Sequence, residues 1–321
     1  MTLLNRTGKK SPIGLIVGII ILVVLLVLPA FGSSNMLSIL SLIFIYMAMG
    51  QMWNLMGGYA GLLSLGMQAF IGIGGYCLAV FSVNYGINIY VAILMGAVFS
   101  VLFGLAVSPA LFKMTGVYFA IGSWVVAEAL LIAFSNWKFV RYAQGIGIST
   151  VYQLSGTQIY YTAMALGVVA VLVVLCLMRS KTGLALMAIR DSAGAAEAMG
   201  VPIYKTKIKC YMIACFFTGL AGGVMYMVQG YIVPSAGFSI QWTVAMTFMV
   251  IIGGSGTMEG PIIGAILYVL LTQYLYNFPG WSMIILGLIA VVVILIAPRG
   301  IFGTINEKTG FEILSPRRSL H

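Results

Sequence analysis

The sequence predicts an all-α, polytopic integral membrane protein with about ten transmembrane helices, some of them broken at glycines. Of its 321 residues, 62% are apolar and only 7% are charged, whereas about 25% are charged in a soluble globular domain. The mean hydropathy is +1.11, so a soluble fold would leave apolar surface in water. A spanning helix takes about 20 apolar residues. These values exclude a soluble enzyme, a disordered chain and a nucleic-acid-binding module.

The expected spans follow from apolar runs that end at glycine, proline, asparagine or charged residues. In order they cover residues 13–29, 36–56, 59–81, 88–108, 116–134, 159–178, 209–229, 240–254, 261–277 and 281–297. The eighth run is short, so we expect it to be tilted, re-entrant or part of a broken helix. The first run also fits a cleavable signal peptide, but we interpret it as a retained helix.

The basic residues predict the orientation. If ten spans start from a cytoplasmic N-terminus, fourteen of the sixteen Lys and Arg residues face the cytoplasm, and only Lys138 and Arg141 lie outside. This asymmetry obeys the positive-inside rule. The basic residues near the C-terminus can contact anionic membrane lipid, although a solvated tail is the favoured interpretation. The predicted regions are a cytoplasmic tail over 1–12, a membrane domain over 13–297 with an extracytoplasmic loop over 135–158 and a cytoplasmic loop over 179–208, and a cytoplasmic tail over 298–321.

The cytoplasmic loop contains the pattern of a short helix with a small-residue face. Asp191 or Ser192 can cap this helix at its start, and Gly200 followed by Pro202 ends it. Such a helix outside the bilayer suits docking of another protein, although a simple helical connector remains an alternative. The candidate docking residues are Arg190, Asp191, Ser192, Ala195, Ala196, Glu197 and Gly200.

Two glycine-rich clusters lie in opposite halves of the sequence. Small residues let membrane helices pack closely, which is one interpretation. Glycine doublets followed by Ser, Thr or Pro also favour helices that break at membrane depth and expose backbone groups to a cavity, as in many transporters. The candidate path residues are Gly57, Gly58, Gly61, Ser64 and Gly66 in the first cluster and Gly253, Gly254, Ser255, Gly256 and Thr257 in the second.

Glu128 is the one ionisable residue in the middle of an expected span, 116–134. Such groups are costly in a membrane and face a bundle interior or water. We include Glu128 among the path candidates, while a hydrogen-bonded structural role stays open.

The sequence lacks the motifs of an enzyme. Its only histidine is His321, and no zinc-protease, nucleophile-elbow, Cys-x-x-Cys or Walker A motif is present. We therefore expect no catalytic residue, no metal site and no cofactor on this chain, and any ATP drive must come from a partner. An ion-coupled secondary transporter remains an alternative, but we would expect it to carry more paired membrane charges. A membrane scaffold or sensor is a further alternative.

Several segments form a recognisable series along the chain: 57–66 with Phe70 and 74–76, 118–120 with Glu128, 188–200, 253–257 with Gly260-Pro261 and Gly264-Ala265, and 297–300 with Gly303. Together they resemble the branched-chain amino-acid ABC transporter permeases, and they occur in the family's order over about residues 57–303. The long external loop and the ending Ala297-Pro298-Arg299-Gly300 most resemble the LivM-type branch.

The resemblance implies a permease subunit of an importer in a bacterial inner membrane, carrying leucine, isoleucine or valine. Some relatives carry urea or short amides. The implied partners are a second, homologous permease, two cytoplasmic ATPase subunits that bind ATP and Mg²⁺, and an extracytoplasmic substrate-binding protein. The family's coupling core, Ala-Ala-x-x-x-Gly, is matched by Ala195, Ala196 and Gly200. Gly194 stands where a glutamate is common, and Met67-Gln68 where many members have His-Ala.

Overall fold

The computed structural model describes residues 24–275, 278–297 and 300–309, and most of them are helical. Where regular structure departs from α-helix, it forms short 3-10 or π turns and one pair of two-residue strands. The elements are η1 Leu28–Ala30, α2 Ser34–Asn54, η2 Leu55–Tyr59, α3 Gln68–Ala79, η3 Val80–Asn84, α4 Ile89–Leu111, α5 Val117–Ser135, η4 Lys138–Val140, η5 Tyr142–Gln144, β1 Ile146–Gly147, η6 Ser149–Gln153, α6 Gly156–Arg179, α7 Lys181–Asp191, α8 Ala193–Ala198, α9 Ile203–Gln229, β2 Tyr231–Ile232, α10 Pro234–Gly237, α11 Gln241–Gly253, α12 Gly260–Tyr274, α13 Pro279–Ile296 and α14 Gly300–Thr309.

Seven helical stretches in the described part of the chain are long and apolar enough to cross a membrane. They are Ser34–Tyr59, Ile89–Leu111, Val117–Ser135, Gly156–Arg179, Ile203–Gln229, Pro234–Gly253 and Ile284–Thr304. Two shorter apolar helices cover Gln68–Asn84 and Gly260–Tyr274. The all-α prediction is confirmed, but the expected count of about ten spans is not. Most of the expected first span, 13–29, lies outside the described residues.

The expected continuous span over 59–81 was wrong. The helix that begins with α2 ends in the π-helical turn η2, and residues 60–67 carry no regular helix before α3 begins. Gly61 has a φ of +68°, a left-handed conformation that glycine adopts without steric cost and that interrupts a right-handed helix. The apolar run therefore combines an irregular segment with a shorter helix.

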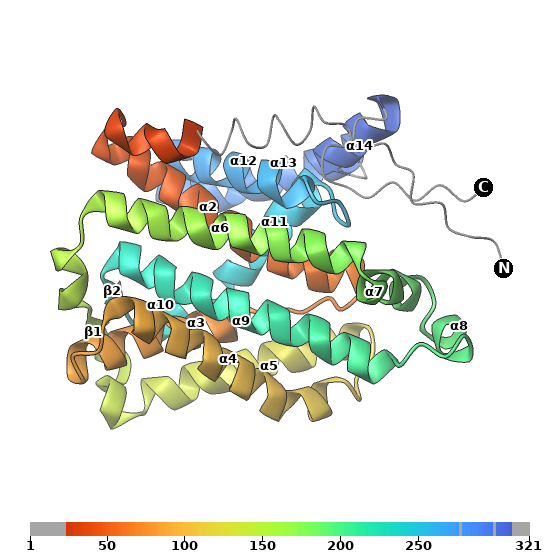
Figure 1. Cartoon of the computed structure of the whole chain (residues 1–321), viewed down its shortest axis with the longest axis horizontal. Coiled ribbons are helices and arrows are strands. Elements are labelled where there is room, and N and C mark those ends of the chain that lie inside the picture. Colours follow the sequence, from red (N-terminus) through yellow and green to blue (C-terminus); the bar gives the residue numbers. More distant parts are fainter. Residues whose placement is uncertain (1–23, 276–277, 298–299, 310–321) are drawn as a thin grey trace.

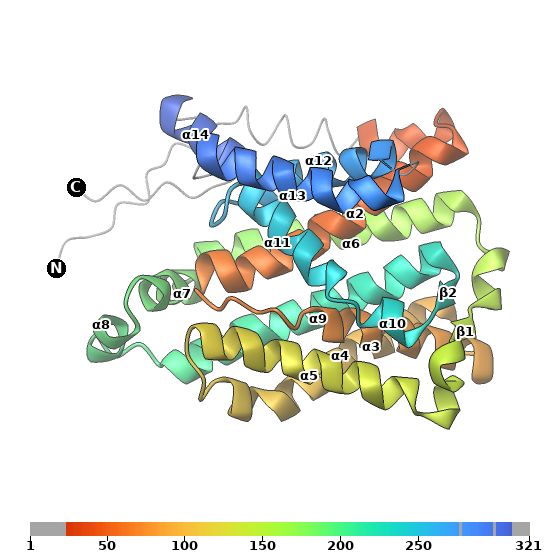
Figure 2. The same ribbon diagram turned by 180° about the vertical axis from the view of Figure 1, so that it is seen from behind.

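The helices form a bundle in which α2 and α9 are central (Figure 1). α2 packs against α6, α9, α11 and α12, and α9 packs against α3 and α4. Seen from behind, α13 lies along the outside of the bundle near α11 and α12 (Figure 2). α7 and α8 extend from one end of the bundle, and the antiparallel pair of β1 and β2 lies at the opposite end. The loops over 179–208 and 135–158 are thus at opposite ends, as two sides of a membrane require.

Glycines bring α3, α4 and α9 into close contact. A Cβ atom on Gly74 would lie only 2.0 Å from the carbonyl oxygen of Gly219, and one on Gly222 would lie 2.3 Å from that of Ile71. Such approach between backbones is available only to residues without side chains. For these glycines the close-packing interpretation holds.

Candidate functional site

The two predicted glycine clusters meet at the C-terminal end of α2. Asn54 donates a hydrogen bond from Nδ2 to the Thr257 carbonyl oxygen at 2.8 Å, and its Oδ1 accepts one from the Gly256 backbone N–H at 2.8 Å. A Cβ atom on Gly58 would lie 2.7 Å from the Gly256 nitrogen. We call Asn54, Gly58, Gly256 and Thr257 the glycine junction.

The junction depends on a polar face of α2. Gln51 lies one turn before Asn54 and donates from Nε2 to the Met258 carbonyl oxygen at 2.7 Å. Residues three apart share one face of a helix, so both amides point at the loop between α11 and α12. The turn in that loop uses the positive φ angles of Gly254 and Gly256. Side-chain amides thus satisfy backbone groups that no helix satisfies.

The segment over 60–67 is held between α2 and α5. Trp53 donates from Nε1 to the Ser64 carbonyl oxygen at 3.1 Å, and the Leu65 N–H donates to the Ser123 hydroxyl at 3.0 Å. A Cβ atom on Gly66 would lie 2.0 Å from the Ser123 carbonyl oxygen. Ser64 and Gly66 are buried, whereas Gly61 is exposed. The first glycine cluster therefore contains a helix break, in addition to close-packed glycines.

The short helix predicted in the loop over 179–208 is confirmed as α8. Ser192, rather than Asp191, is its N-cap: the Ser192 hydroxyl accepts from the Ala195 N–H at 3.3 Å. Asp191 is the last residue of α7. Gly200 follows α8 with a φ of +81°, the left-handed conformation expected just past a helix end. Ala196 is buried.

On α8, Ala195 and Glu197 are exposed, as are Ala193 and Gly194 before them. A small, accessible face is therefore present at this end of the bundle.

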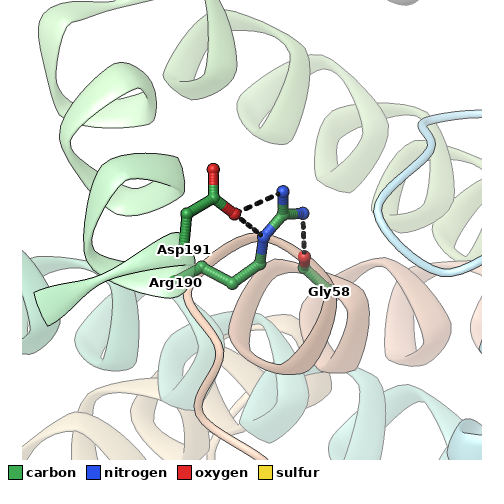
Figure 3. A network of polar contacts seen from close by, with 3 residues as sticks. All are labelled: Gly58, Arg190 and Asp191. Carbon is green, nitrogen blue, oxygen red and sulfur yellow. Dashed lines mark hydrogen bonds and ion pairs between the residues drawn. The ribbon is translucent and has the colours of Figure 1, made fainter.

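Arg190 joins α7 to the glycine junction (Figure 3). Its Nη1 donates to the Gly58 carbonyl oxygen at 2.9 Å. Its Nε donates to Asp191 Oδ1 at 3.0 Å, and Nη2 lies 3.0 Å from the same oxygen. One guanidinium thus links residues of the predicted docking loop with a residue of the predicted path.

Glu128 is not part of these contacts. Its side chain is half-buried on α5, and its Oε1 accepts a hydrogen bond from Trp124 Nε1, one turn away, at 3.0 Å. The contact is local to one helix and does not tie Glu128 to either glycine cluster. In the described residues, no group of three or more His, Cys, Asp or Glu side chains is placed to hold a metal ion.

Sequence reasoning missed Gln51, Asn54 and Ser123 as site residues. The available signal was polarity at helical spacing: Gln51 and Asn54 are buried amides three residues apart in an otherwise apolar span. Polar groups within a membrane span mark a partner or a function. Ser123 carried a weaker signal, since a single serine is common in membrane helices and can bond to its own helix.

Comparison with known proteins places the chain in a family. The sequence model of the permease component of branched-chain amino acid transport systems matches residues 35–295. The high-affinity branched-chain amino acid transport system permease protein LivM of Escherichia coli is 26% identical over 314 residues, covering 87% of this chain and 74% of the relative. The same protein of Salmonella typhimurium is 24% identical, covering 88% and 73%.

A third relative covers a smaller part. The probable branched-chain amino acid transport permease protein LivH of Methanocaldococcus jannaschii is 30% identical over 143 residues, which is 42% of this chain and 44% of the relative. No solved structure matches the chain significantly.

Proposed function

Because the chain belongs to the family of branched-chain amino acid transport permeases, we propose that it forms part of the translocation path of an ATP-driven importer for leucine, isoleucine or valine. The observation that carries the proposal is the glycine junction. Two helix breaks from distant parts of the sequence meet there, next to the segment that would receive force from an ATPase.

The junction has chemistry suited to a zwitterion with an apolar side chain. Broken helices expose backbone N–H and C=O groups, which can meet the carboxylate and the ammonium of an amino acid. The surrounding spans provide apolar walls for a branched side chain. We propose that Gly57, Gly58, Gly61 and Gly253–Thr257 contribute these backbone groups in a conformation that releases Gly58 from Arg190 and releases Gly256 and Thr257 from Asn54.

In this proposal, α7 and α8 face the cytoplasm, as the distribution of basic residues favours. Their small exposed face docks on an ATPase subunit, which supplies ATP and Mg²⁺. A second, homologous permease completes the path, and an extracytoplasmic binding protein delivers the substrate. ATP must then favour one of two conformations of the permease pair, because a ligand with equal affinity for both conformations does not change their populations.

The proposal is tested in proteoliposomes that contain both permeases and both ATPases, with binding protein outside and ATP inside. We expect accumulation of leucine, isoleucine or valine with ATP inside and none without it. A hydrolysis-deficient ATPase serves as the control and should abolish uptake.

Uptake that persists with the deficient ATPase and collapses with the proton gradient would instead establish a secondary transporter. Uptake of urea or a short amide, without the branched-chain amino acids, would contradict the substrate assignment. A complex that binds its partners but moves none of these solutes would indicate a scaffold or sensor.

A further inference from the structure

We propose that Arg190 is the positioning residue that transmits movement of the docking segment, α7 and α8, to the glycine junction. This inference rests on the proposed function and specifies the residue through which an ATPase would act on the path. It is carried by three kinds of contact that converge on one side chain: a hydrogen bond, an ion pair and close packing against two glycines.

The guanidinium bonds to one side of the junction and lies near the other. Nη1 donates to the Gly58 carbonyl oxygen at 2.9 Å, and it lies 3.3 Å from the position that a Cβ atom on Gly256 would occupy. Gly58 belongs to the end of α2 and η2, whereas Gly256 belongs to the loop between α11 and α12. A shift of Arg190 therefore acts on both helix breaks together.

The stem of Arg190 rests on the chain that leaves η2. A Cβ atom on Gly61 would lie 3.2 Å from Arg190 Cγ and 3.3 Å from its Cα. Gly61 also has a φ of +68°. Glycine at this position thus permits the turn away from the helix and allows α7 to approach closely.

The Gly58 carbonyl is a favourable acceptor for a cation. It lies at the C-terminal end of a helix, where carbonyl groups lack intrahelical donors and carry the negative end of the helix dipole. The Leu62 N–H, just beyond this helix end, donates to the Met56 carbonyl oxygen at 2.8 Å and not to that of Gly58.

Asp191 fixes the direction of the guanidinium. Its Oδ1 faces both Nε and Nη2, each at 3.0 Å, and this leaves Nη1 directed at Gly58. The Asp191 side chain is 69% exposed, so the ion pair itself contributes little stability. Its role is orientation, which needs the planar fork of arginine and which a lysine ammonium cannot reproduce.

The path of transmission is short. Arg190 is in the last turn of α7, and Ser192, two residues later, caps α8. α8 cannot move far without moving Arg190. Packed contacts switch between discrete arrangements and do not deform continuously, so a displacement of α8 is passed on to the residues that Arg190 contacts.

Hydrogen–deuterium exchange on the full chain in lipid nanodiscs tests the contact directly. Arg190→Ala should lower amide protection at least about tenfold in two segments distant in sequence, 54–62 and 254–259, because a charged hydrogen bond is lost. Arg190→Lys should give a partial loss. Lys181→Ala, an exposed lysine in the first turn of the same helix, is the matched control and should leave both segments unchanged.

A purely local role would raise exchange in α7 alone, and that result would overturn the inference. The side chain of Arg190 is 38% exposed, so removing it should not prevent folding. Arg190→Lys, which keeps the charge, provides a second and milder variant.

The transport assay separates this inference from the proposed function. In the reconstituted complex, Arg190→Ala should raise the ATP hydrolysed per substrate moved several-fold, whereas Lys181→Ala should not. If the unaltered complex transports and Arg190→Ala keeps its normal ratio, Arg190 does not transmit the movement, but the proposed function stands. If the unaltered complex moves no branched-chain amino acid, the proposed function fails, and the exchange result decides the role of Arg190.

Discussion

At the scale of single residues, Asn54 shows how one amide can hold two distant backbone segments together. It accepts from Gly256 and donates to Thr257, each at 2.8 Å. Asn54→Ala leaves both backbone groups without that partner. Hydrogen bonds between membrane helices each contribute roughly 0.6–1.7 kcal/mol, so we expect a loss of about 1–3 kcal/mol in unfolding free energy, measured by denaturation in mixed micelles.

Asn136→Ala is the matched control for this change. The Asn136 amide donates to the Ile132 carbonyl oxygen of its own helix at an exposed site, where water can replace it, so its effect should stay within about 0.5 kcal/mol. Equal losses for the two variants would show that Asn54 does not join α2 to the loop.

Gly264 lies where α12 packs closely against α11. A Cβ atom there would lie 1.9 Å from the Met249 carbonyl oxygen, and backbone cannot move aside cheaply. Gly264→Ala should therefore destabilise the protein by about 1–3 kcal/mol or more, seen as a lower thermal midpoint in detergent. Gly287→Ala in α13, where a Cβ meets nothing within 4 Å, should not lower it. A normal midpoint for Gly264→Ala would mean that the two helices are not packed this closely.

At the scale of elements, composition predicts helices well and their interruptions poorly. The runs over 88–108 and 116–134 correspond closely to α4 and α5, because apolar length alone specifies a spanning helix. The run over 59–81 is equally apolar, but Gly66 lies against Ser123 and Trp53 bonds to Ser64. These contacts join separate elements, so local sequence does not contain them.

The glycine clusters illustrate the same limit. Their composition predicted helix breaks, and breaks occur after η2 and between α11 and α12. Their meeting at Asn54 was not predicted, since it joins residues about two hundred positions apart in the chain. The helix α8 in the loop over 179–208 was predictable, because capping by Ser192 and termination at Gly200 are local interactions.

The helix α8 is the proposed docking element. Ala195 is exposed, whereas Ala196 is buried, so Ala195→Arg adds a bulky charge to the outer face and leaves the inner contact unchanged. We expect normal insertion of the complex but ATP hydrolysis uncoupled from uptake. Gly194→Ala, which meets nothing within 4 Å, is the control and should retain coupling. Unimpaired uptake by Ala195→Arg would exclude docking through this face.

At the scale of the whole molecule, the outer surface of the bundle is apolar over several helices. α4, α5 and α13 expose large apolar side chains, including Leu102, Val125 and Leu288. Such a surface must face lipid or another membrane protein, because in water it would drive association. The buried core is mostly apolar as well, and the amides of Gln51 and Asn54 are exceptions within it that bind backbone groups.

The neutral glycine junction predicts weak intrinsic binding of substrate. The junction residues Asn54, Gly58, Gly256 and Thr257 are uncharged, and the Arg190 guanidinium beside them is already paired with Asp191. Neutral dipoles offset the dehydration of a zwitterion only in part. Weak binding also allows release toward the cytoplasm. We expect the purified permease pair to bind leucine no more tightly than about 1 mM, equivalent to about −4 kcal/mol, in isothermal titration calorimetry. The isolated binding protein, titrated alongside, should bind far more tightly and supply the selectivity. Micromolar binding by the permease pair alone would contradict this division, and would require a charged or enclosed site within the membrane domain.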